Sequence, residues 1–501
     1  MLGQGGLILK RRMPIFYSAL LLTGVNLLLR FVSTGFQVYL SGRIGAAGIG
    51  LLQLVLSVGG LATTAGMAGV RTGTMYLTAE ELGRKRPQNV TWVLSGCMRY
   101  SIAFSLSVCV LLYFGAPFLA QYWIGDVRVV GAIRLYGAFV PVFCLCGVMT
   151  GYFTAANRIG ALAGVEVVEQ LLCMGATIGL LFYWAGDDPV RACMCVILGS
   201  GLSACLTLLL LTFLRSREQQ PAGVRIPVRK RLAQVALPLA LADDLKAGIN
   251  TTENLMVPKR LALYPGQKEP LAAFGTVCGM VFPVMMFPAA ILFGLAELLI
   301  PELARCHAAG SQRRIRYLTR RSLRLALIYG CVMGGGMVLL AEPLCKSLYG
   351  NVEAGKWLRY YAMMVPMLYC DAITDAMTKG LGQQKACVRY NILTSALDVI
   401  FLFLLLPKYG MAGYFVSFLV THVLNFGLSL RRLLKTANMR IRIVPPLLAS
   451  FAGVMAVVLG FGFDGVVRLV AFCAAFFAFL CLFRVVGKED AAWLRGLIQR
   501  K

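Results

Sequence analysis

Three acidic residues lie deep within apolar segments, where an ionised side chain is costly and usually functional. Asp243 and Asp244 lie in the segment 231–255, and Asp398 lies in the segment 386–406. Each is about twelve residues from the start of its segment, roughly 18 Å along a helix. We expect these carboxylates to share one depth in a membrane. Lys246 is close to the aspartates in sequence, so an internal ion pair is the alternative.

Further oxygen-bearing side chains accompany Asp398 in its segment. Asn391, Ser395 and Asp398 follow a spacing of four and then three, which places them on one helical face, and Thr394 lies beside that stripe. Carboxylate, amide and hydroxyl oxygens suit a small hard cation or a proton. We therefore predict an ion-coupling set that holds Na⁺ or H⁺: Asp243, Asp244, Asn391, Thr394 and Asp398.

Two arginines in the first part of the chain could bind an anion. Arg30 lies about sixteen residues into the first apolar segment, roughly 24 Å at 1.5 Å per residue. Arg71 lies near the end of the second. A guanidinium binds phosphate with two parallel hydrogen bonds. The alternatives are that each side chain extends to the membrane surface or pairs with a buried acid. We predict Arg30 and Arg71 as substrate-binding residues.

These residues must be positioned by membrane-spanning helices. The chain has 501 residues, of which 58% are hydrophobic and 14% charged, far from the composition of soluble domains. We predict an all-α polytopic membrane protein with about fourteen spans of roughly 20 residues or more. The predicted spans are 14–40, 46–76, 88–114, 127–152, 159–184, 189–214, 231–255, 270–299, 315–341, 356–379, 386–406, 410–430, 443–462 and 465–486.

The formal net charge of +27 indicates the orientation. Basic residues concentrate after the second span, in 84–86, and in the connections 215–231, 305–321 and 431–442, which share one side with both termini. Because cytoplasmic loops are enriched in Lys and Arg, we expect a multi-pass protein of the cytoplasmic membrane with both termini in the cytoplasm. No basic stripe interleaved with aromatic residues is present, so nucleic acid is not an expected partner.

Signatures of enzymes are absent from the sequence. It contains no phosphate-binding Walker loop, no nucleophile elbow and no zinc-protease motif, and its only histidines are His307 and His422. The sixteen cysteines lie mostly within spans without zinc-ligand spacing. We therefore predict a protein that is not an enzyme and has no cofactor other than a coupling ion.

The chain carries signs of an internal duplication. Arg134, Tyr136 and Pro141 recur at a constant offset as Arg359, Tyr361 and Pro366, and the pairs Gly50/Gly275, Gly69/Gly294 and Ala161/Ala386 keep that offset. Six spans precede a basic linker and six follow it, as in parallel repeats of transporters. We predict an N-lobe at 1–220, a C-lobe at 221–435, and two further helices with a tail at 436–501.

The stretch 29–53, LRFVSTGFQVYLSGRIGAAGIGLLQ, carries a resemblance to a known family. It resembles the opening of the stage V sporulation protein B-like, or polysaccharide biosynthesis, branch of the multidrug/oligosaccharidyl-lipid/polysaccharide (MOP) exporter superfamily, which is related to MurJ lipid II flippases and MATE exporters. The residues that carry it are Arg43, Gly45, Ala46, Gly48, Ile49, Gly50, Leu51 and Gln53.

The resemblance implies two six-helix bundles and an alternating-access flippase for undecaprenyl-pyrophosphate-linked sugars, such as lipid II, in cell-wall, spore-cortex or polysaccharide synthesis. The expected partners are the lipid-linked oligosaccharide, membrane lipids and cell-wall synthesis enzymes. In MurJ-like relatives arginines of the first helices line the head-group cavity, which Arg30 matches, whereas Phe36 stands where a further arginine is expected. Relatives hold sodium between helices seven and eleven. A cation-coupled multidrug exporter is the alternative function.

Overall fold

The computed structural model describes residues 15–483 except 85, 187, 218–227 and 440–443, and every regular element in this part of the chain is helical. The all-helical polytopic fold predicted from the sequence is confirmed. Both termini and the centre of the basic linker, which supported the predicted orientation, lie outside the described residues.

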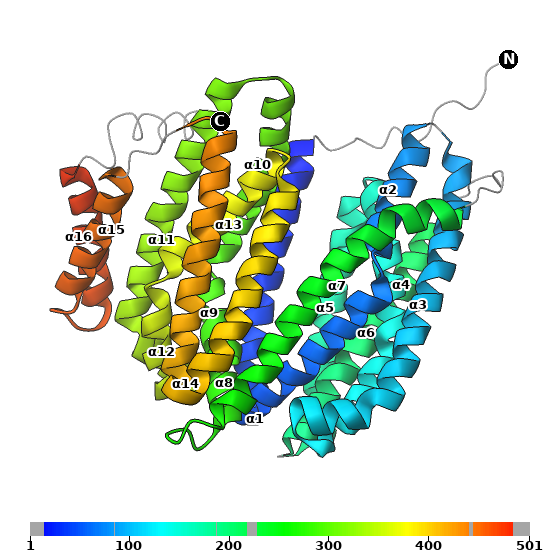
Figure 1. Cartoon of the computed structure of the whole chain (residues 1–501), viewed down its shortest axis with the longest axis horizontal. Helices are drawn as coiled ribbons and strands as arrows, with labels where there is room; N and C mark the ends of the chain where they lie inside the picture. The colour runs from blue at the N-terminus through cyan, green and yellow to red at the C-terminus, as the bar shows by residue number, and fades with distance from the viewer. Residues whose placement is uncertain (1–14, 85, 187, 218–227, 440–443, 484–501) are drawn as a thin grey trace. The chain divides into compact units, whose positions relative to one another are not determined.

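The helices follow one another with short connections (Figure 1). The α-helices are α1 (Ile15–Met67), α2 (Val70–Gly83), α3 (Val90–Phe118), α4 (Val130–Ala155), α5 (Ile159–Leu180), α6 (Pro189–Ser216), α7 (Val228–Leu261), α8 (Pro270–Thr276), α9 (Phe282–Met286), α10 (Ala289–Ala308), α11 (Gln312–Tyr349), α12 (Val352–Ala362), α13 (Val365–Gly380), α14 (Gln384–Thr436), α15 (Val444–Gly460) and α16 (Gly465–Leu482). Short 3₁₀ or π-helical turns are η1 (Pro87–Asn89), η2 (Leu119–Ile124), η3 (Val127–Val129), η4 (Leu181–Ala185) and η5 (Val277–Val281).

Two helices of 53 residues each contain a sharp break at a glycine. Gly45 in α1 has φ 71° and ψ 176°, and Gly410 in α14 has φ 59° and ψ −139°. Both conformations are readily available only to glycine, since a Cβ would clash with the backbone there. The breaks fall at the predicted junctions 40/46 and 406/410. Each long helix therefore supplies two of the predicted spans.

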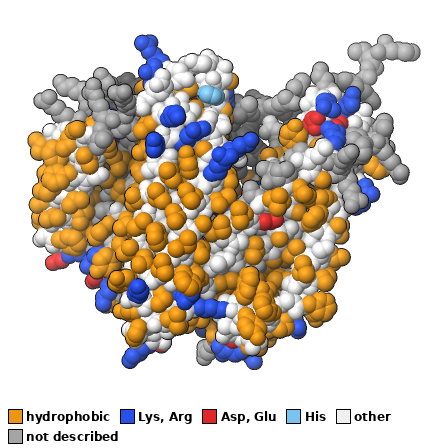
Figure 2. All heavy atoms as spheres, viewed as in Figure 1, with side chains coloured by type: hydrophobic (Ala, Val, Ile, Leu, Met, Phe, Trp, Pro, Cys, Tyr) orange, Lys and Arg blue, Asp and Glu red, His pale blue; other side chains and the backbone are white. Residues whose placement is uncertain are grey.

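Seven helices in the described part of the chain are long and apolar enough to cross a membrane, or eight if the bent pair Pro270–Met286 and Ala289–Ala308 is one span. Hydrophobic side chains cover much of the visible helix surfaces, while Lys and Arg gather mainly toward helix ends (Figure 2). This distribution suits helices that face lipid along their length and water at their ends.

The chain forms two compact units. Unit 1 comprises 1–33 and 58–247, and unit 2 comprises 34–57 and 248–501. Each unit therefore takes a segment from the sequence half that supplies most of the other. Residues 34–57 of α1 belong to unit 2, and residues 228–247 of α7 belong to unit 1.

In unit 1, α4 contacts α2, α3 and α6, and α5 pairs with α6. The start of α7 packs on this group through small residues. Ala236 lies against Gly69, where an added Cβ would come within 2.3 Å of the Ala236 carbonyl oxygen, and Leu232 lies against Gly73. Buried Val70, Leu77, Val148, Leu232 and Ala236 belong to one apolar core. The start of α7 is therefore an integral part of unit 1.

In unit 2, α11 contacts α12, α13 and α15, while α13 also contacts α10 and α14. Residues 34–57 of α1 cross α8 at Gly50 and Gly275, which are one of the pairs in the predicted duplication. A Cβ on Gly275 would lie 2.0 Å from the Ala46 carbonyl oxygen and 2.6 Å from the Gly50 nitrogen. Because real Cβ atoms do not approach backbone so closely, this helix crossing depends on glycine.

Candidate functional site

Asp398 is the centre of a polar cluster buried within unit 2. Its side chain lies on α14 and is only 4% exposed. Past the break at Gly410, the same helix returns with two hydroxyl groups that donate to Oδ1 of Asp398. Ser417 Oγ lies at 2.5 Å and Thr421 Oγ1 at 3.2 Å from that oxygen. The break thus lets one helix supply a carboxyl group and the donors that stabilise it.

Glu253 of α7 completes this cluster, because its carboxyl group lies close enough to that of Asp398 for the two to interact. Two ionised carboxylates this close would repel each other in a water-poor interior. A proton shared between them would remove that repulsion, because a protonated carboxyl group can donate a hydrogen bond to an ionised one. The oxygens of Glu253, Asp398, Ser417 and Thr421 are also chemically suited to a small hard cation.

Aromatic rings enclose this cluster. Phe418 stacks on Phe282 with ring centroids 5.3 Å apart, and the fully buried Tyr361 meets Phe418 edge to face, also at 5.3 Å. His422, one turn further along α14, stacks on Phe418 with its ring centroid 3.8 Å from that of the phenylalanine. This apolar enclosure limits access of water to the two carboxyl groups, which strengthens their interaction.

The predicted ion-coupling residues are divided between the two units. Asn391, Thr394 and Asp398 belong to unit 2, where Thr394 donates its hydroxyl to the Tyr390 carbonyl oxygen at 2.9 Å. Asp243 and Asp244 belong to unit 1, and Asp244 is close enough to Tyr100 of α3 to interact electrostatically. Among the described residues no group of three or more His, Cys, Asp or Glu side chains could hold a metal ion. The complete five-residue set remains a prediction.

Sequence reasoning missed Glu253 as well as the hydroxyl groups of Ser417 and Thr421. A signal for Glu253 was present, because five consecutive polar residues, Asn250–Asn254, follow Asp243 and Asp244 in the same predicted span. Two neighbours of Glu253 are also bonded within unit 2. Thr251 Oγ1 donates to the Ser57 carbonyl oxygen at 3.1 Å, and Asn254 Nδ2 donates to the Ser57 hydroxyl at 2.9 Å.

Arg71 lies in the first turn of α2, immediately after a break within the predicted span 46–76. The break is formed by Ala68 and Gly69, with φ 41° and 70°. The Tyr100 hydroxyl donates to the Ala68 carbonyl oxygen at 3.4 Å. The side chain of Arg71 is exposed within unit 1 and interacts electrostatically with Glu166 of α5. A helix start carries partial positive charge, so the guanidinium and the helix act together on an anion.

The other charged groups of unit 1 include a second arginine and a second glutamate. Arg30 of α1 is assigned to unit 1 and is exposed. Glu169 lies one turn after Glu166 on α5, and its carboxyl group is close enough to the Thr207 side chain of α6 to interact with it. Unit 1 therefore contains both arginines and carboxyl groups that could contact a charged substrate.

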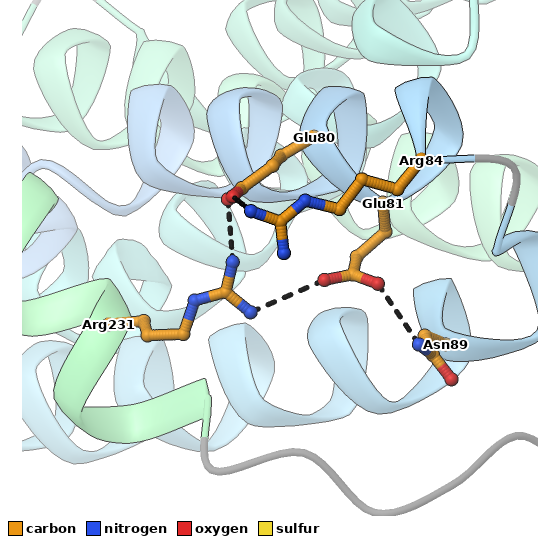
Figure 3. Close-up of polar contacts among 5 residues, drawn as sticks. All are labelled: Glu80, Glu81, Arg84, Asn89 and Arg231. Atoms are coloured by element: carbon orange, nitrogen blue, oxygen red, sulfur yellow. Dashed lines mark hydrogen bonds and ion pairs between the residues drawn. The ribbon is translucent and has the colours of Figure 1, made fainter.

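A network of ion pairs joins the start of α7 to the end of α2 in unit 1 (Figure 3). The Arg231 guanidinium contacts Glu80 at 2.7 Å and Glu81 at 3.3 Å. Glu81 is 2% exposed and also accepts a hydrogen bond from Asn89 at 3.0 Å, while Glu80 pairs with Arg84 at 2.7 Å. The network holds the start of α7 in unit 1, several turns before Glu253 on the same helix.

These features define the class of protein: a polytopic helical membrane protein with two units and polar groups buried among its helices. No model of a known protein family matches the chain. Among solved structures, the chain is similar to a lipid II flippase MurJ in an inward closed conformation, with a TM-score of 0.69, 11% identity, and coverage of 93% of this chain and 98% of the other. It is also similar to an inward-facing multidrug resistance MATE family transporter of the MOP superfamily, with a TM-score of 0.65, 14% identity, and coverage of 84% and 100%.

Relatives by sequence agree with that class. The chain is 22% identical over 497 residues to stage V sporulation protein B of Bacillus subtilis (strain 168). The matched region covers 94% of this chain and 96% of the relative. It is 24% identical over 248 residues to a probable lipid II flippase MurJ of Rhizobium meliloti (strain 1021), covering 46% and 43%. These similarities agree with the predicted resemblance to the stage V sporulation protein B-like branch of the MOP superfamily, which is related to MurJ and MATE transporters. They also agree with the prediction that the chain is not an enzyme.

Proposed function

We propose that this MOP-superfamily transporter is a flippase that moves undecaprenyl-pyrophosphate-linked sugars, lipid II or a related lipid-linked oligosaccharide, across the cytoplasmic membrane. The transported sugar would serve cell-wall, spore-cortex or polysaccharide synthesis. Support comes from the full-length similarity to stage V sporulation protein B and the partial similarity to a probable lipid II flippase. Cell-wall synthesis enzymes would be its partners, and both termini would lie in the cytoplasm.

The observation that carries the proposal is the position of Arg71. Its guanidinium follows a helix break and stands at the positively polarised start of α2. Half-helix starts of this kind face anionic substrate groups in many transporters. A pyrophosphate would gain two charge-assisted hydrogen bonds from Arg71 and attraction from the helix start. In our proposal Arg30 supplies a second positive charge, and Glu166 interacts with Arg71 when the phosphate is absent.

The coupling ion in this proposal is a proton held between Glu253 and Asp398. The support is the proximity of their carboxyl groups and the two hydroxyl groups that donate to Asp398. When the proton leaves, the two negative charges repel each other, and this repulsion favours a conformation in which α7 and α14 lie further apart. Such a change alters the relative stability of two conformations, which is what alternating access requires. Sodium, with Asn391 and Thr394 as additional ligands, is the alternative ion.

A cation-coupled multidrug exporter is the second candidate function. It is favoured by the carboxyl groups of unit 1, namely those of Glu166, Glu169, Asp243 and Asp244. A cationic drug would require these acids and would bind without the arginines. The two functions therefore differ in whether transport depends on positively or negatively charged side chains.

Translocation of a fluorescent lipid II in proteoliposomes tests the proposal. We expect transport by the wild-type protein, and at least about a tenfold loss in Arg71→Gln, because a lost phosphate hydrogen bond pair costs more than about 1.4 kcal/mol. The matched control is Arg99→Gln on α3, an exposed arginine whose Nε donates to the Ser95 carbonyl oxygen within its own helix. Lipid II transport that survives Arg71→Gln, or drug export that requires the acids and not Arg71, would refute the proposed role.

A further inference from the structure

The first part of α11 presents one exposed face of arginines. Arg313, Arg316 and Arg320 follow spacings of three and then four residues, so they lie on one side of the helix, and Tyr317 lies on the same side. All four residues are exposed. The opposite side is buried within unit 2 and consists of Ile315, Thr319, Ser322 and Ala326. We call Arg313, Arg316, Tyr317 and Arg320 the arginine face.

The positive charge of the arginine face is not compensated within the described part of the chain. Residues 312–324 contain no Asp or Glu. Glu302 of α10 approaches the start of α11, but it pairs with Arg314 at 2.6 Å and with Arg305 at 3.7 Å, which lie outside the face. None of the three arginines of the face forms an ion pair with a described residue. Their guanidinium groups can therefore pair with an acidic partner.

Tyr317 gives this face an aromatic centre. It is 54% exposed, and the guanidinium of Arg321 lies 5.6 Å from the centroid of its ring and donates from Nη1 to its hydroxyl. Tyrosine and arginine are among the residue types that anchor protein interfaces, whereas lysine, which is absent from 312–324, is depleted there. A guanidinium also binds a carboxylate with two parallel hydrogen bonds, which an ammonium group cannot do. The composition of the face therefore fits recognition of carboxylates.

The length of α11 places most of this face beyond the reach of lipid head groups. The helix has 38 residues, roughly 57 Å at 1.5 Å per residue, whereas the hydrocarbon core of a bilayer is about 30 Å thick. The apolar part of the predicted span 315–341 begins at Leu325, so Arg316 lies about 14 Å and Arg313 about 18 Å outside the core. A head-group layer extends only about 5–8 Å from the core. Because lipid charges are screened over about 8 Å, most of the face projects into water.

The chain itself does not supply an acidic occupant for this face. Both ends of the sequence, 1–14 and 484–501, carry more basic than acidic residues, and a second copy with a formal net charge of +27 would be repelled. Nucleic acid fits less well than protein, because single strands bind through several stacked aromatic rings and this face has one. An acidic protein segment complements both the charge of the arginines and the ring of Tyr317.

We propose that the arginine face of α11 docks an acidic segment of a partner protein in the cytoplasm. Carboxylates of that segment pair with Arg313, Arg316 and Arg320, and one of its apolar side chains packs on the Tyr317 ring. A helix with Asp or Glu at spacings of three and four residues matches the three arginines. The cytoplasmic location follows from the predicted orientation. Docking of this kind is independent of the transported substrate and of the coupling ion.

Peptide binding to the intact protein tests this docking surface. Purified protein in phosphatidylcholine nanodiscs would be titrated with a fluorescent helical peptide that carries Glu at the spacing of the three arginines, and binding would be followed by anisotropy. We expect Arg316→Gln with Arg320→Gln to weaken binding by at least about tenfold, because each arginine loses a charge-assisted pair of hydrogen bonds. Tyr317→Ala should also weaken binding although the net charge is unchanged, because the aromatic contact is lost.

The matched control is Arg431→Gln with Lys435→Gln at the end of α14. These two residues are also exposed, belong to unit 2 and are one turn apart, so the control removes the same charge and should leave peptide binding unchanged. No binding by the wild type, or equal losses in the two double variants, would overturn the docking surface. The difference between the two double variants should persist when the nanodiscs contain phosphatidylglycerol. Its disappearance would show that lipid head groups occupy the face, which would also overturn the proposal.

Cross-linking in cells identifies the natural occupant. With the photoreactive residue benzoylphenylalanine in place of Tyr317, we expect an adduct with an acidic segment of a second protein, which is lost when Arg316→Gln and Arg320→Gln are added. An adduct with phospholipid, nucleic acid, a segment that is not acidic or another copy of this chain would contradict the proposal. Absence of any adduct, or an adduct that survives the loss of both arginines, would contradict it as well.

Discussion

Replacement of Arg231 by methionine should destabilise unit 1 by about 2 kcal/mol. Breaking a buried ion pair by removing one partner costs about 3–5 kcal/mol, because the remaining charge loses its compensation. Here Glu81 is 2% exposed but keeps Asn89, and Glu80 keeps Arg84. Arg231 is also 32% exposed, so solvent screens part of its interaction. Both facts lower the expected cost.

Thermal unfolding of the purified protein in detergent measures this cost. For a unit of this size about 1 kcal/mol corresponds to roughly 2–4 °C, so Arg231→Met should lower Tm by about 4–8 °C. The control is Arg84→Met, whose partner Glu80 retains Arg231; at 53% exposure its pair contributes about 0–1 kcal/mol. Adding Glu81→Gln to Arg231→Met should recover part of the loss, because it removes the uncompensated charge. The reasoning fails if Arg231→Met leaves Tm unchanged, or if Arg84→Met costs as much.

Three other substitutions have defined outcomes. Gly275→Ala places a Cβ 2.0 Å from the Ala46 carbonyl oxygen and should lower the free energy of unfolding by roughly 3 kcal/mol through overpacking. In the control, Gly336→Ala on α11, the nearest atom to the added Cβ is 3.7 Å away, so stability should be unchanged or slightly higher. The unfolding temperatures of the two variants test this difference. Asp126 caps η3 by accepting a hydrogen bond from the Arg128 backbone nitrogen, and the hydrogen bond from the Arg128 side chain lowers the pKa of Asp126. The stabilisation that Asp126 gives the folded state is therefore fully present above the unfolded-state pKa of about 3.9, and it is lost as pH falls through the lower folded-state pKa. Asp126→Ala should therefore cost about 1 kcal/mol at pH 7 and little near pH 2, and a cost that persists in acid would contradict this assignment. Ser417→Ala removes the hydroxyl group that donates to Oδ1 of Asp398 at 2.5 Å and should slow proton-coupled transport by about tenfold. A transport rate equal to that of the wild type would show that this hydrogen bond is dispensable.

Much of the fold was predictable because it depends on composition and backbone conformation. Composition and long apolar segments predicted a polytopic helical protein, and the glycines at 45 and 410 fall at junctions between predicted spans. The pairing of Gly50 with Gly275 gives a physical reason for one of the duplicated positions. The break before Arg71 was not predicted, since Ala68 and Gly69 lie within an apolar run that resembles one continuous span.

The candidate site was harder to predict because depth along a helix does not determine which neighbour a side chain meets. Asp243 and Asp398 share an expected depth, yet Asp243 belongs to unit 1 and Asp398 to unit 2. The acid that interacts with Asp398 is Glu253, ten residues after Asp243 on α7. Its partners Ser417 and Thr421 are residues of ordinary type whose role appears only when α14 turns back at Gly410.

The repeated tyrosines illustrate the same limit. Tyr136 forms a 3.2 Å hydrogen bond between its hydroxyl and that of Thr63, and its ring lies against Gly59. Tyr361 is fully buried among Phe282, Phe415 and Phe418, and its hydroxyl has no hydrogen-bond partner in the described part of the chain. A constant offset between the halves therefore does not imply a shared environment, which depends on the neighbouring helices.

Binding of the pyrophosphate group to Arg71 is the central claim, and native mass spectrometry tests it most directly. The wild-type protein would be titrated with undecaprenyl pyrophosphate, with phosphatidylglycerol as the comparison anion, and Arg71→Gln and Arg99→Gln would be measured alongside. We predict tighter binding of the pyrophosphate lipid than of phosphatidylglycerol, at least about tenfold weaker pyrophosphate binding in Arg71→Gln, and no change in Arg99→Gln. Equal binding of the two lipids, or full binding by Arg71→Gln, would contradict the account.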